Sequence, residues 1–279
     1  MTIISLTLII LAGAYLAGLI GSMTGLGGGF IVIPLLTLIL HVDIRYAIGA
    51  SLVSVIATSS GAGVAYAKEG VANLRLAMFL EIATTIGAIA GAFFSAYVPV
   101  HIIPVLIGTI LIFSSVMSLR KIKDTKCEHP SQLGYRLKLN GTYRMGAQNI
   151  NYSIRNITGG FFTMLFAGFT SGLLGIGSGA LKVLAMDSVM RVPFKVSTTT
   201  SNFMIGVTAA ASAVIYFQHG YMDTVITMPV GIGVLLGSLT GARLLARINS
   251  PRTLRLIFAI VVSMLAIQMM YNGIKTHNQ

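Results

Sequence analysis

Two short glycine-rich stretches offer this chain a means of binding a small anion. The first is Gly25-Leu26-Gly27-Gly28-Gly29, and Gly175-Ile176-Gly177-Ser178-Gly179 follows it by 150 residues. Each stretch interrupts an apolar segment, and a helix that restarts after such a break presents free N–H groups and a positive dipole end. Two such ends that meet would form an anion site made largely of backbone. The predicted ligands are Gly27, Gly28, Gly29, Gly177, Ser178 and Gly179.

Polar side chains follow each glycine stretch in the next apolar segment. Ser51 follows the first, and the run Thr198-Thr199-Thr200-Ser201-Asn202 follows the second. Hydroxyl and carboxamide groups can donate hydrogen bonds to an oxyanion, although hydroxyls inside helices also bond back to their own helix. A run of five polar residues exceeds what back-bonding requires. We therefore predict that Ser51, Thr199, Ser201 and Asn202 contact the oxygens of the anion.

Three ionisable residues, Glu81, Lys182 and Asp187, lie within apolar sequence, where a charge is costly and hence suggests a function. Lys182 comes three residues after Gly179 and could act as the counter-charge to a bound anion. Its alternatives are an ion pair with Asp187 or a side chain that reaches toward the membrane surface. Glu81 could carry a coupling proton, and its alternative is a position near the cytoplasmic boundary beside Arg75.

The composition predicts a membrane protein with several spans. Hydrophobic residues make up 55% of the chain and charged residues 9%, whereas about 25% of an average soluble domain is charged. The net charge of +12 does not indicate a nucleic-acid partner, because eight of the 19 Lys and Arg residues fall between Arg120 and Arg155. Basic residues placed in this way mark the cytoplasmic side of a membrane.

The apolar segments fall into two halves, 1–119 and 157–279, joined by a basic linker at 120–156. The first half contains a broken block at 3–40 and spans near 46–67, 74–97 and 102–119, and the second contains a broken block at 157–190 and spans near 194–217, 224–246 and 254–271. The shift of 150 residues also superposes Gly18 on Gly168, Ser51 on Ser201 and Thr58 on Thr208. An internal duplication accounts for this match.

Charge predicts that the two halves face opposite ways. With the linker in the cytoplasm, the turn at 97–101 is outside and carries no Lys or Arg, whereas its counterpart near 243–255 carries four Arg residues. The turn at 68–75 is basic and inside, whereas its counterpart at 218–223 has no Lys or Arg. Both termini are then outside, and Arg45 is the one charge that opposes the scheme.

The predicted fold class is therefore an all-α polytopic membrane protein of two inverted-topology repeats. Each repeat has about four hydrophobic helical blocks, and the first block is broken by a glycine-rich re-entrant tip. A hairpin fits because 157–190 is too short for two crossings of a ~30 Å core. Small residues can also serve only helix packing. We assign that role to Gly87, Gly91, Gly237 and Gly241, which have the four-residue packing spacing.

These residues resemble the TauE/SafE sulfite-exporter family. The resemblance rests on the run from Gly25 to Pro34, its degenerate copy at 175–184 and the stretch from Pro193 to Asn202. It implies secondary export or exchange of small sulfur-containing or carboxylate anions held between the two repeats. The second copy departs from the family pattern, since Ser178 replaces a glycine, Lys182 stands among aliphatic residues and Leu184 stands where proline is common.

The sequence thus predicts a transporter of sulfite- or sulfonate-type anions in the cytoplasmic (inner) membrane, working by alternating access. The alternative is an anion channel that uses the same tips as a filter. No nucleophile–base pair or paired carboxylates lie within the spans, so we do not expect an enzyme. Neither a cofactor nor a metal is expected, and the expected partners are a small anion and the lipid bilayer. The base rate for oligomers favours a homodimer.

Overall fold

The computed structural model describes residues 3–24, 27–69, 72–119, 132–137, 139–145, 148–245, 263–264, 266–271 and 273. Gly25, Leu26, residues 120–131 of the linker and most of the last predicted span lie outside the described residues. The helices are α1 (Ile3–Thr24), α2 (Gly29–Pro34), α3 (Ile44–Glu69), α4 (Leu74–Ser95), α5 (Ile102–Leu119), α6 (Gln132–Arg136), α7 (Ile157–Leu174), α8 (Gly179–Leu184), α9 (Phe194–Gln218) and α10 (Thr224–Leu245). The π-helical segments η1 (Leu35–Ile39) and η2 (Ala185–Val189) continue α2 and α8, and the strands are β1 (Gly141–Met145) and β2 (Gln148–Tyr152).

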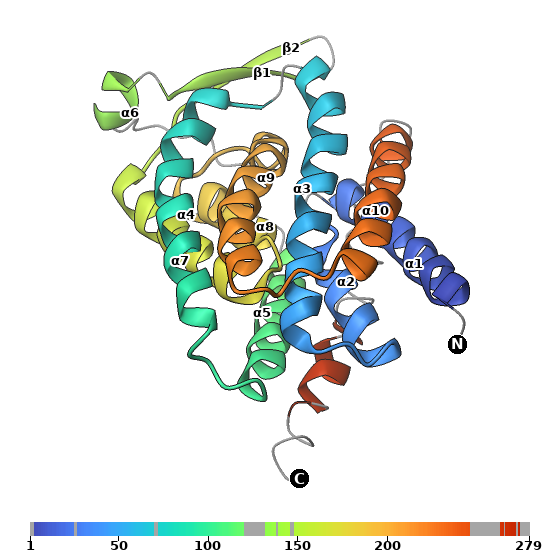
Figure 1. Ribbon diagram of the computed structural model, residues 1–279. Helices are drawn as coiled ribbons and strands as arrows, with labels where there is room; N and C mark the ends of the chain where they lie inside the picture. Colours follow the sequence, from blue (N-terminus) through green and yellow to red (C-terminus); the bar gives the residue numbers. More distant parts are fainter. Residues whose placement is uncertain are drawn as a thin grey trace.

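Six helices in the described part of the chain are long and apolar enough to cross a membrane. They are α1, α3, α4, α7, α9 and α10. The α3 window is the most enclosed of them, with 67% of its residues buried. Figure 1 shows why, because α3 and α9 lie between the pair α4–α7 on one side and the pair α1–α10 on the other. The chain is a helical, multi-pass membrane protein.

Each half of the chain packs against the other through glycines. Gly18 of α1 lies against the backbone of Val234 in α10, and Gly168 of α7 lies against the backbone of Thr84 in α4. A Cβ atom at either glycine would overlap the facing carbonyl oxygen. The two contacts are equivalent under the 150-residue shift, because Gly18 corresponds to Gly168 and Val234 corresponds to Thr84. The two halves therefore make the same contact twice, each with the other.

The helix-packing role predicted for Gly87, Gly91, Gly237 and Gly241 is confirmed. Added Cβ atoms would meet carbonyl oxygens of the partner helix, on Leu165 and Phe169 in α7 and on Tyr15 and Leu19 in α1. The glycines concerned are Gly87 and Gly91 in α4 and Gly237 and Gly241 in α10. Small residues allow the backbones of paired helices to approach closely where the lipid supplies no hydrophobic drive for association.

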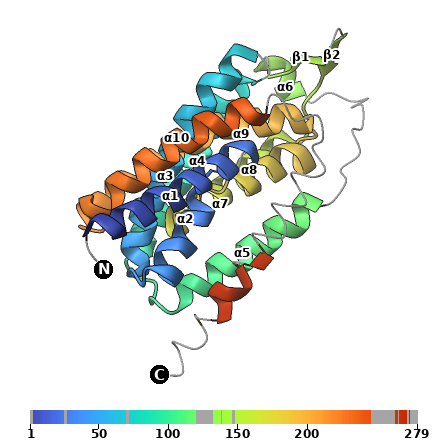
Figure 2. The same ribbon diagram turned by 90° about the vertical axis from the view of Figure 1, so that its right-hand side faces the viewer.

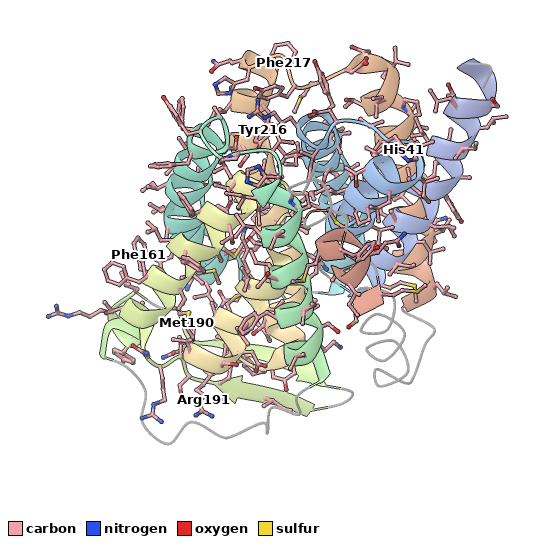
Figure 3. The ribbon with its side chains drawn as sticks, turned by 90° about the horizontal axis from the view of Figure 1, so that it is seen from below. His41, Phe161, Met190, Arg191, Tyr216 and Phe217 are labelled. Atoms are coloured by element: carbon pink, nitrogen blue, oxygen red, sulfur yellow. The ribbon has the colours of Figure 1, made fainter. Side chains whose placement is uncertain are left out.

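The two arms that follow the glycine stretches end at opposite ends of the bundle. Figure 2 shows the hairpin β1–β2 at one end of the long helices and the start of α1 at the other. His41 and Arg191 follow η1 and η2 with left-handed φ angles of 53° and 59°. In Figure 3, Arg191 lies at the hairpin end, whereas His41 lies in the other half of the molecule, toward Phe217.

Arg45 has a local explanation for its position at the end opposite the hairpin. Its Nη1 donates a hydrogen bond to the Tyr221 hydroxyl at 2.9 Å, and the guanidinium carbon lies 5.3 Å from the centre of the Tyr221 ring. Tyr221 belongs to the turn between α9 and α10. The arginine thus joins two turns that the sequence predicted to be on the same side of the membrane.

The linker contains structure that the sequence analysis did not predict. Strands β1 and β2 pair antiparallel, with Gly141 opposite Tyr152. Tyr143 and Ile154 are buried in a cluster with residues of α4, α7 and α9. The Asn73 carboxamide fastens this segment to the start of α4, because it donates to the Leu139 carbonyl at 2.7 Å and the Tyr152 hydroxyl at 2.9 Å.

Candidate functional site

The two glycine stretches, called the first and second tips below, meet at the middle of α3. A Cβ atom at Gly27, Gly29 or Gly177 would lie 3.4, 2.9 or 2.9 Å from the Val55 side chain. Val55 is fully buried, and its counterpart by the 150-residue shift, Ile205 of α9, touches Gly27. The φ angles of +82° at Gly27 and +74° at Gly177 favour glycine. Residues 150 apart in sequence are thus brought into one core region.

Short helical arms follow both stretches. Gly29–Ile39 is an apolar helix too short to be counted as a span, and its length of about 16 Å is half of a ~30 Å hydrocarbon core. Each arm changes from α- to π-helix at the equivalent position, Leu35 and Ala185. Pro34 precedes the first π-segment but Leu184 the second, so proline is not required for the change. Short π-helical segments often occur at functional sites.

Hydroxyl groups of α3 and α9 hold the two stretches together. Ser51 Oγ donates to the Gly175 carbonyl at 2.6 Å, and Ser201 Oγ donates to the Gly179 carbonyl at 3.2 Å. Thr58 Oγ1 accepts the Gly28 N–H at 3.2 Å. Both serines are completely buried. In this structure their protons are directed to backbone carbonyls, so these side chains position the tips.

Other buried polar atoms of α3, α9 and the second glycine stretch have no hydrogen-bond partner among the described residues. They include both the oxygen and the nitrogen of the Asn202 carboxamide and the hydroxyls of Ser178 and Ser54. Asn202 and Ser54 are 0% exposed and Ser178 is 4% exposed. Leaving such groups unsatisfied costs about 1–3 kcal/mol each. Two of these hydroxyls lie at the glycine stretches, since Ser178 belongs to the second stretch and Ser54 Oγ is 3.0 Å from a Cβ placed at Gly28.

Thr199 does not join this unpartnered group. Its Oγ1 donates to the carbonyls of Lys195 at 3.0 Å and Val196 at 3.1 Å, on its own helix. This is the back-bonding that was the alternative to anion contact. Asn202, one helical turn further on, is the member of the polar run whose side chain has no partner in the described part of the chain.

Lys182 and Glu81 are brought together, which the sequence analysis did not predict. Lys182 Nζ lies 3.8 Å from Glu81 Oε2, and it donates a hydrogen bond to Thr208 Oγ1. Thr208 Oγ1 also lies 2.6 Å from Glu81 Oε1. The lysine is 0% exposed and the glutamate side chain 12%. The ion-pair partner of Lys182 is therefore Glu81, and not Asp187, which the sequence analysis gave as the alternative. Glu81 in turn lies beside Lys182, whereas its predicted alternative was a position beside Arg75.

Sequence reasoning missed Ser54 and Thr208 as site residues. A signal for Thr208 was present, since it matches Thr58 under the 150-residue shift and both hydroxyls bond back four residues along their helices. Ser54 lies one turn before Thr58 and faces the same tip, with its Oγ 3.0 Å from a Cβ placed at Gly28. Helical spacing from Thr58 could have identified it.

The tip at Gly177 gives a testable consequence of this geometry. Gly177→Ala is expected to lower the thermal stability of the detergent-purified protein and abolish ligand-induced stabilisation, because the new Cβ would lie 2.9 Å from Val55 at a φ of +74°. The matched control is Gly220→Ala, which has a φ of +73° but no described atom within 4 Å. Equal losses in the two variants would show that φ strain alone, and not the closeness of the tip to Val55, limits this position.

Comparison with known protein families gives a match over most of the chain. The family described as "Sulfite exporter TauE/SafE" matches residues 10–269. The probable membrane transporter protein YunE of Bacillus subtilis (strain 168) is 27% identical over 266 residues, which cover 93% of this chain and 95% of the relative. The probable membrane transporter protein MJ0441 of Methanocaldococcus jannaschii is 26% identical over 282 residues, covering 95% of each chain.

A second protein of Bacillus subtilis (strain 168), the probable membrane transporter protein YdhB, is 24% identical over 236 residues, covering 85% of this chain and 89% of the relative. No solved structure matches the chain. The family match covers nearly the whole sequence, including both glycine stretches and the helices that position them. The protein therefore belongs to the sulfite exporter TauE/SafE family.

Proposed function

We propose that this protein is a secondary transporter that exports or exchanges small sulfur-containing anions of the sulfite or sulfonate type by alternating access. The observation that carries the proposal is the meeting of both glycine stretches at Val55. The Ser178 hydroxyl of the second stretch and the Asn202 carboxamide of α9 are buried without a partner among the described residues. The anion class rests on the family to which the chain belongs and on the buried cation Lys182.

In this proposal the anion sits between the tips. The N–H groups of Gly27 and Gly29 and of Gly177, Ser178 and Gly179 would face it, with the Asn202 carboxamide and the Ser178 hydroxyl donating to its oxygens. The Gly28 N–H would join them only by leaving the hydroxyl of Thr58, to which it donates in this structure. Ser51 and Ser201 would hold the tip carbonyls away from the negative charge, which is how their hydrogen bonds run in this structure. Thr199 would contribute only if its hydroxyl turned from its own helix.

We also propose that the two halves are inverted repeats with re-entrant tips. The support is the reciprocal contact of Gly18 with Val234 and Gly168 with Thr84, together with the opposite placement of His41 and Arg191 in Figure 3. The hairpin end would face the cytoplasm, because exposed basic side chains gather in the segments that lie there. These are Arg75, Arg136, Arg155, Arg191 and Lys195.

The test is binding followed by transport with purified wild-type protein. Sulfite, sulfoacetate, thiosulfate and acetate are compared by thermal shift, and the stabilising anions are then followed as labelled counterflow into proteoliposomes. We expect a sulfur-containing anion, and not acetate, to stabilise the protein and to undergo saturable exchange. The equivalent position in the first half is Leu52, so Asn202→Leu introduces the residue type found there. This variant is expected to bind the anion about tenfold or more weakly, because it loses one buried hydrogen bond to a charged ligand.

Two outcomes would overturn this proposal. If none of the four anions stabilises or exchanges, the site at the tips is not an anion site of this class. If anions cross the membrane without saturation and never accumulate against a gradient, the protein is the anion channel that the sequence offered as the alternative. Unchanged anion binding in Asn202→Leu would show that the Asn202 carboxamide is not part of the site.

A further inference from the structure

The Glu81–Thr208–Lys182 cluster joins the two halves of the chain at the second tip. Glu81 comes from α4 in the first half, whereas Lys182 belongs to α8, the arm that restarts after the second glycine stretch. Lys182 lies one helical turn after Ser178, whose carbonyl accepts the Lys182 N–H at 3.0 Å and whose hydroxyl has no described partner. The flexible four-carbon stem of a lysine allows its ammonium group to serve either a carboxylate or a ligand at the tip.

The ion pair is poorly built for stability alone. Lys182 Nζ is 3.8 Å from Glu81 Oε2, and this oxygen accepts no hydrogen bond from the described residues. A buried pair offsets the cost of removing two charges from water only when its geometry is good and the remaining polar atoms are satisfied. The pair is therefore one that another anion could replace at low cost.

Thr208 can serve Glu81 in both of its protonation states. Its single hydroxyl proton has two close acceptors, Glu81 Oε1 at 2.6 Å and the Met204 carbonyl at 3.0 Å. When Glu81 is a carboxylate, Thr208 donates to it. When Glu81 is protonated, the carboxyl O–H can donate to Thr208, whose own proton then turns to the Met204 carbonyl. The short 2.6 Å contact is retained in either arrangement.

The equivalent positions in the other half carry no charge, so the cluster is not a requirement of the fold. The shift of 150 residues places Val32 at the position of Lys182, Thr58 at that of Thr208 and Gly231 at that of Glu81. Thr58 keeps the back-bond of its counterpart, to the Ser54 carbonyl at 2.9 Å. It accepts the Gly28 N–H where Thr208 accepts Lys182. The second tip has thus gained an acid and a base together.

Few other titratable groups lie on the elements packed around the cluster. Helices α5 and α7 contain none. Arg75 and Lys195 are exposed at the hairpin end, and Tyr216 donates to the Leu173 carbonyl toward the other end. Asp187 in η2 is buried and is the other acid to be tested. Glu81 is the acid in contact with Lys182 among the described residues.

We infer that the transported anion and the Glu81 carboxylate compete for Lys182, so that each anion crosses the membrane together with one proton on Glu81. This inference rests on the proposed function. Anion binding at the second tip draws the ammonium group away from Glu81, and the carboxylate takes up one proton from solution. No covalent bond other than the carboxyl O–H forms or breaks. By reciprocity, protonation of Glu81 strengthens anion binding to the same extent.

The experiment compares exchange with net transport in proteoliposomes, using labelled thiosulfate and sulfoacetate, which do not themselves bind protons near neutral pH. Wild type is expected to exchange internal for external anion and to accumulate anion when the outside is acidified at clamped voltage. Glu81→Gln is expected to retain exchange, which needs no net proton movement, and to lose the accumulation. The matched control is Asp223→Asn, which removes an exposed carboxylate at the α10 start and is expected to behave as wild type.

A measurement on the wild type alone keeps the inference testable if Glu81→Gln does not fold. Anion addition to weakly buffered protein should remove one proton from solution per anion bound, and anion affinity should rise by up to about tenfold for each unit of acidification.

Exchange without proton uptake or pH-driven accumulation would overturn the inference and leave the proposed function intact. So would coupling that survives in Glu81→Gln but is lost in Asp187→Asn. If wild type neither binds nor exchanges either anion, the proposed function itself fails.

Discussion

Replacing Lys182 with methionine is expected to destabilise the folded protein by about 3–5 kcal/mol, because the Glu81 carboxylate then remains buried without its counter-charge. Methionine keeps most of the volume of the lysine stem, so the effect measures the lost charge. The loss should be largest at alkaline pH and should shrink on acidification, since a proton neutralises the orphaned carboxylate. Thermal unfolding of detergent-purified protein across a pH series measures both effects.

The control is the double variant Glu81→Gln with Lys182→Met. It removes both charges, so most of the stability lost in Lys182→Met should return. Glutamine can still hydrogen-bond to Thr208, which keeps the local contact. If the double variant is as unstable as the sum of the single variants, the two side chains do not act as a pair.

Gly168→Ala is expected to have the second large effect, a loss of about 1–3 kcal/mol or failure to accumulate as folded protein. The added methyl would overlap the backbone of Thr84, so α4 and α7 would have to separate along their contact. Gly18→Ala is expected to cause a similar loss, because the same contact is made with Val234 in α10. Fluorescence-detected size exclusion and thermal unfolding provide the comparison.

Gly63→Ala is the matched control for both variants. Gly63 also lies in a long helix, but no described atom is within 4 Å of an added Cβ. Alanine there should be neutral or stabilise the protein by about 0.4–1 kcal/mol through the reduced entropy of the unfolded chain. A loss at Gly63 equal to that at Gly168 would mean that close backbone approach is not what the α4–α7 contact requires.

The features predicted well from sequence are those that residue type alone encodes. Glycine often marks close backbone approach or positive φ, and so Gly87, Gly91, Gly177 and Gly237 were informative without coordinates. The 150-residue shift also predicted which positions of the two halves are equivalent, such as Gly18 and Gly168. The family resemblance followed from the same residues and is confirmed by the match over residues 10–269.

The Glu81–Lys182 pair could not be predicted in the same way. These residues are far apart in sequence, and their contact depends on the crossing of α4 over the arm that contains α8. The partners that lie nearby in the chain are Asp187 for Lys182 and Arg75 for Glu81. The hydrogen-bond acceptors of Ser51 and Ser201 could not be predicted from sequence either. Both hydroxyls were expected to donate to the anion, but in the structure they donate to backbone carbonyls of the second glycine stretch.

The β-hairpin was missed for a different reason. The segment 120–156 is polar and contains eight basic residues, and this composition predicted only a linker between the two halves. The short connection between Met145 and Gln148 contains a glycine, which is a hairpin signal when it separates two runs of β-formers. Tyr143 and Ile150 supplied such residues on the two strands.

The reciprocal glycine contacts also constrain how the protein is made. Helix α1 ends at Thr24, and its partner α10 begins 200 residues later at Thr224. At about 5–20 residues per second, the ribosome needs on the order of 10–40 s to supply that partner. During this interval the small-residue face of α1 has entered the bilayer with only lipid, or the insertion machinery, to cover it. Biogenesis must therefore hold the first half in an unpaired state until the second half is synthesised.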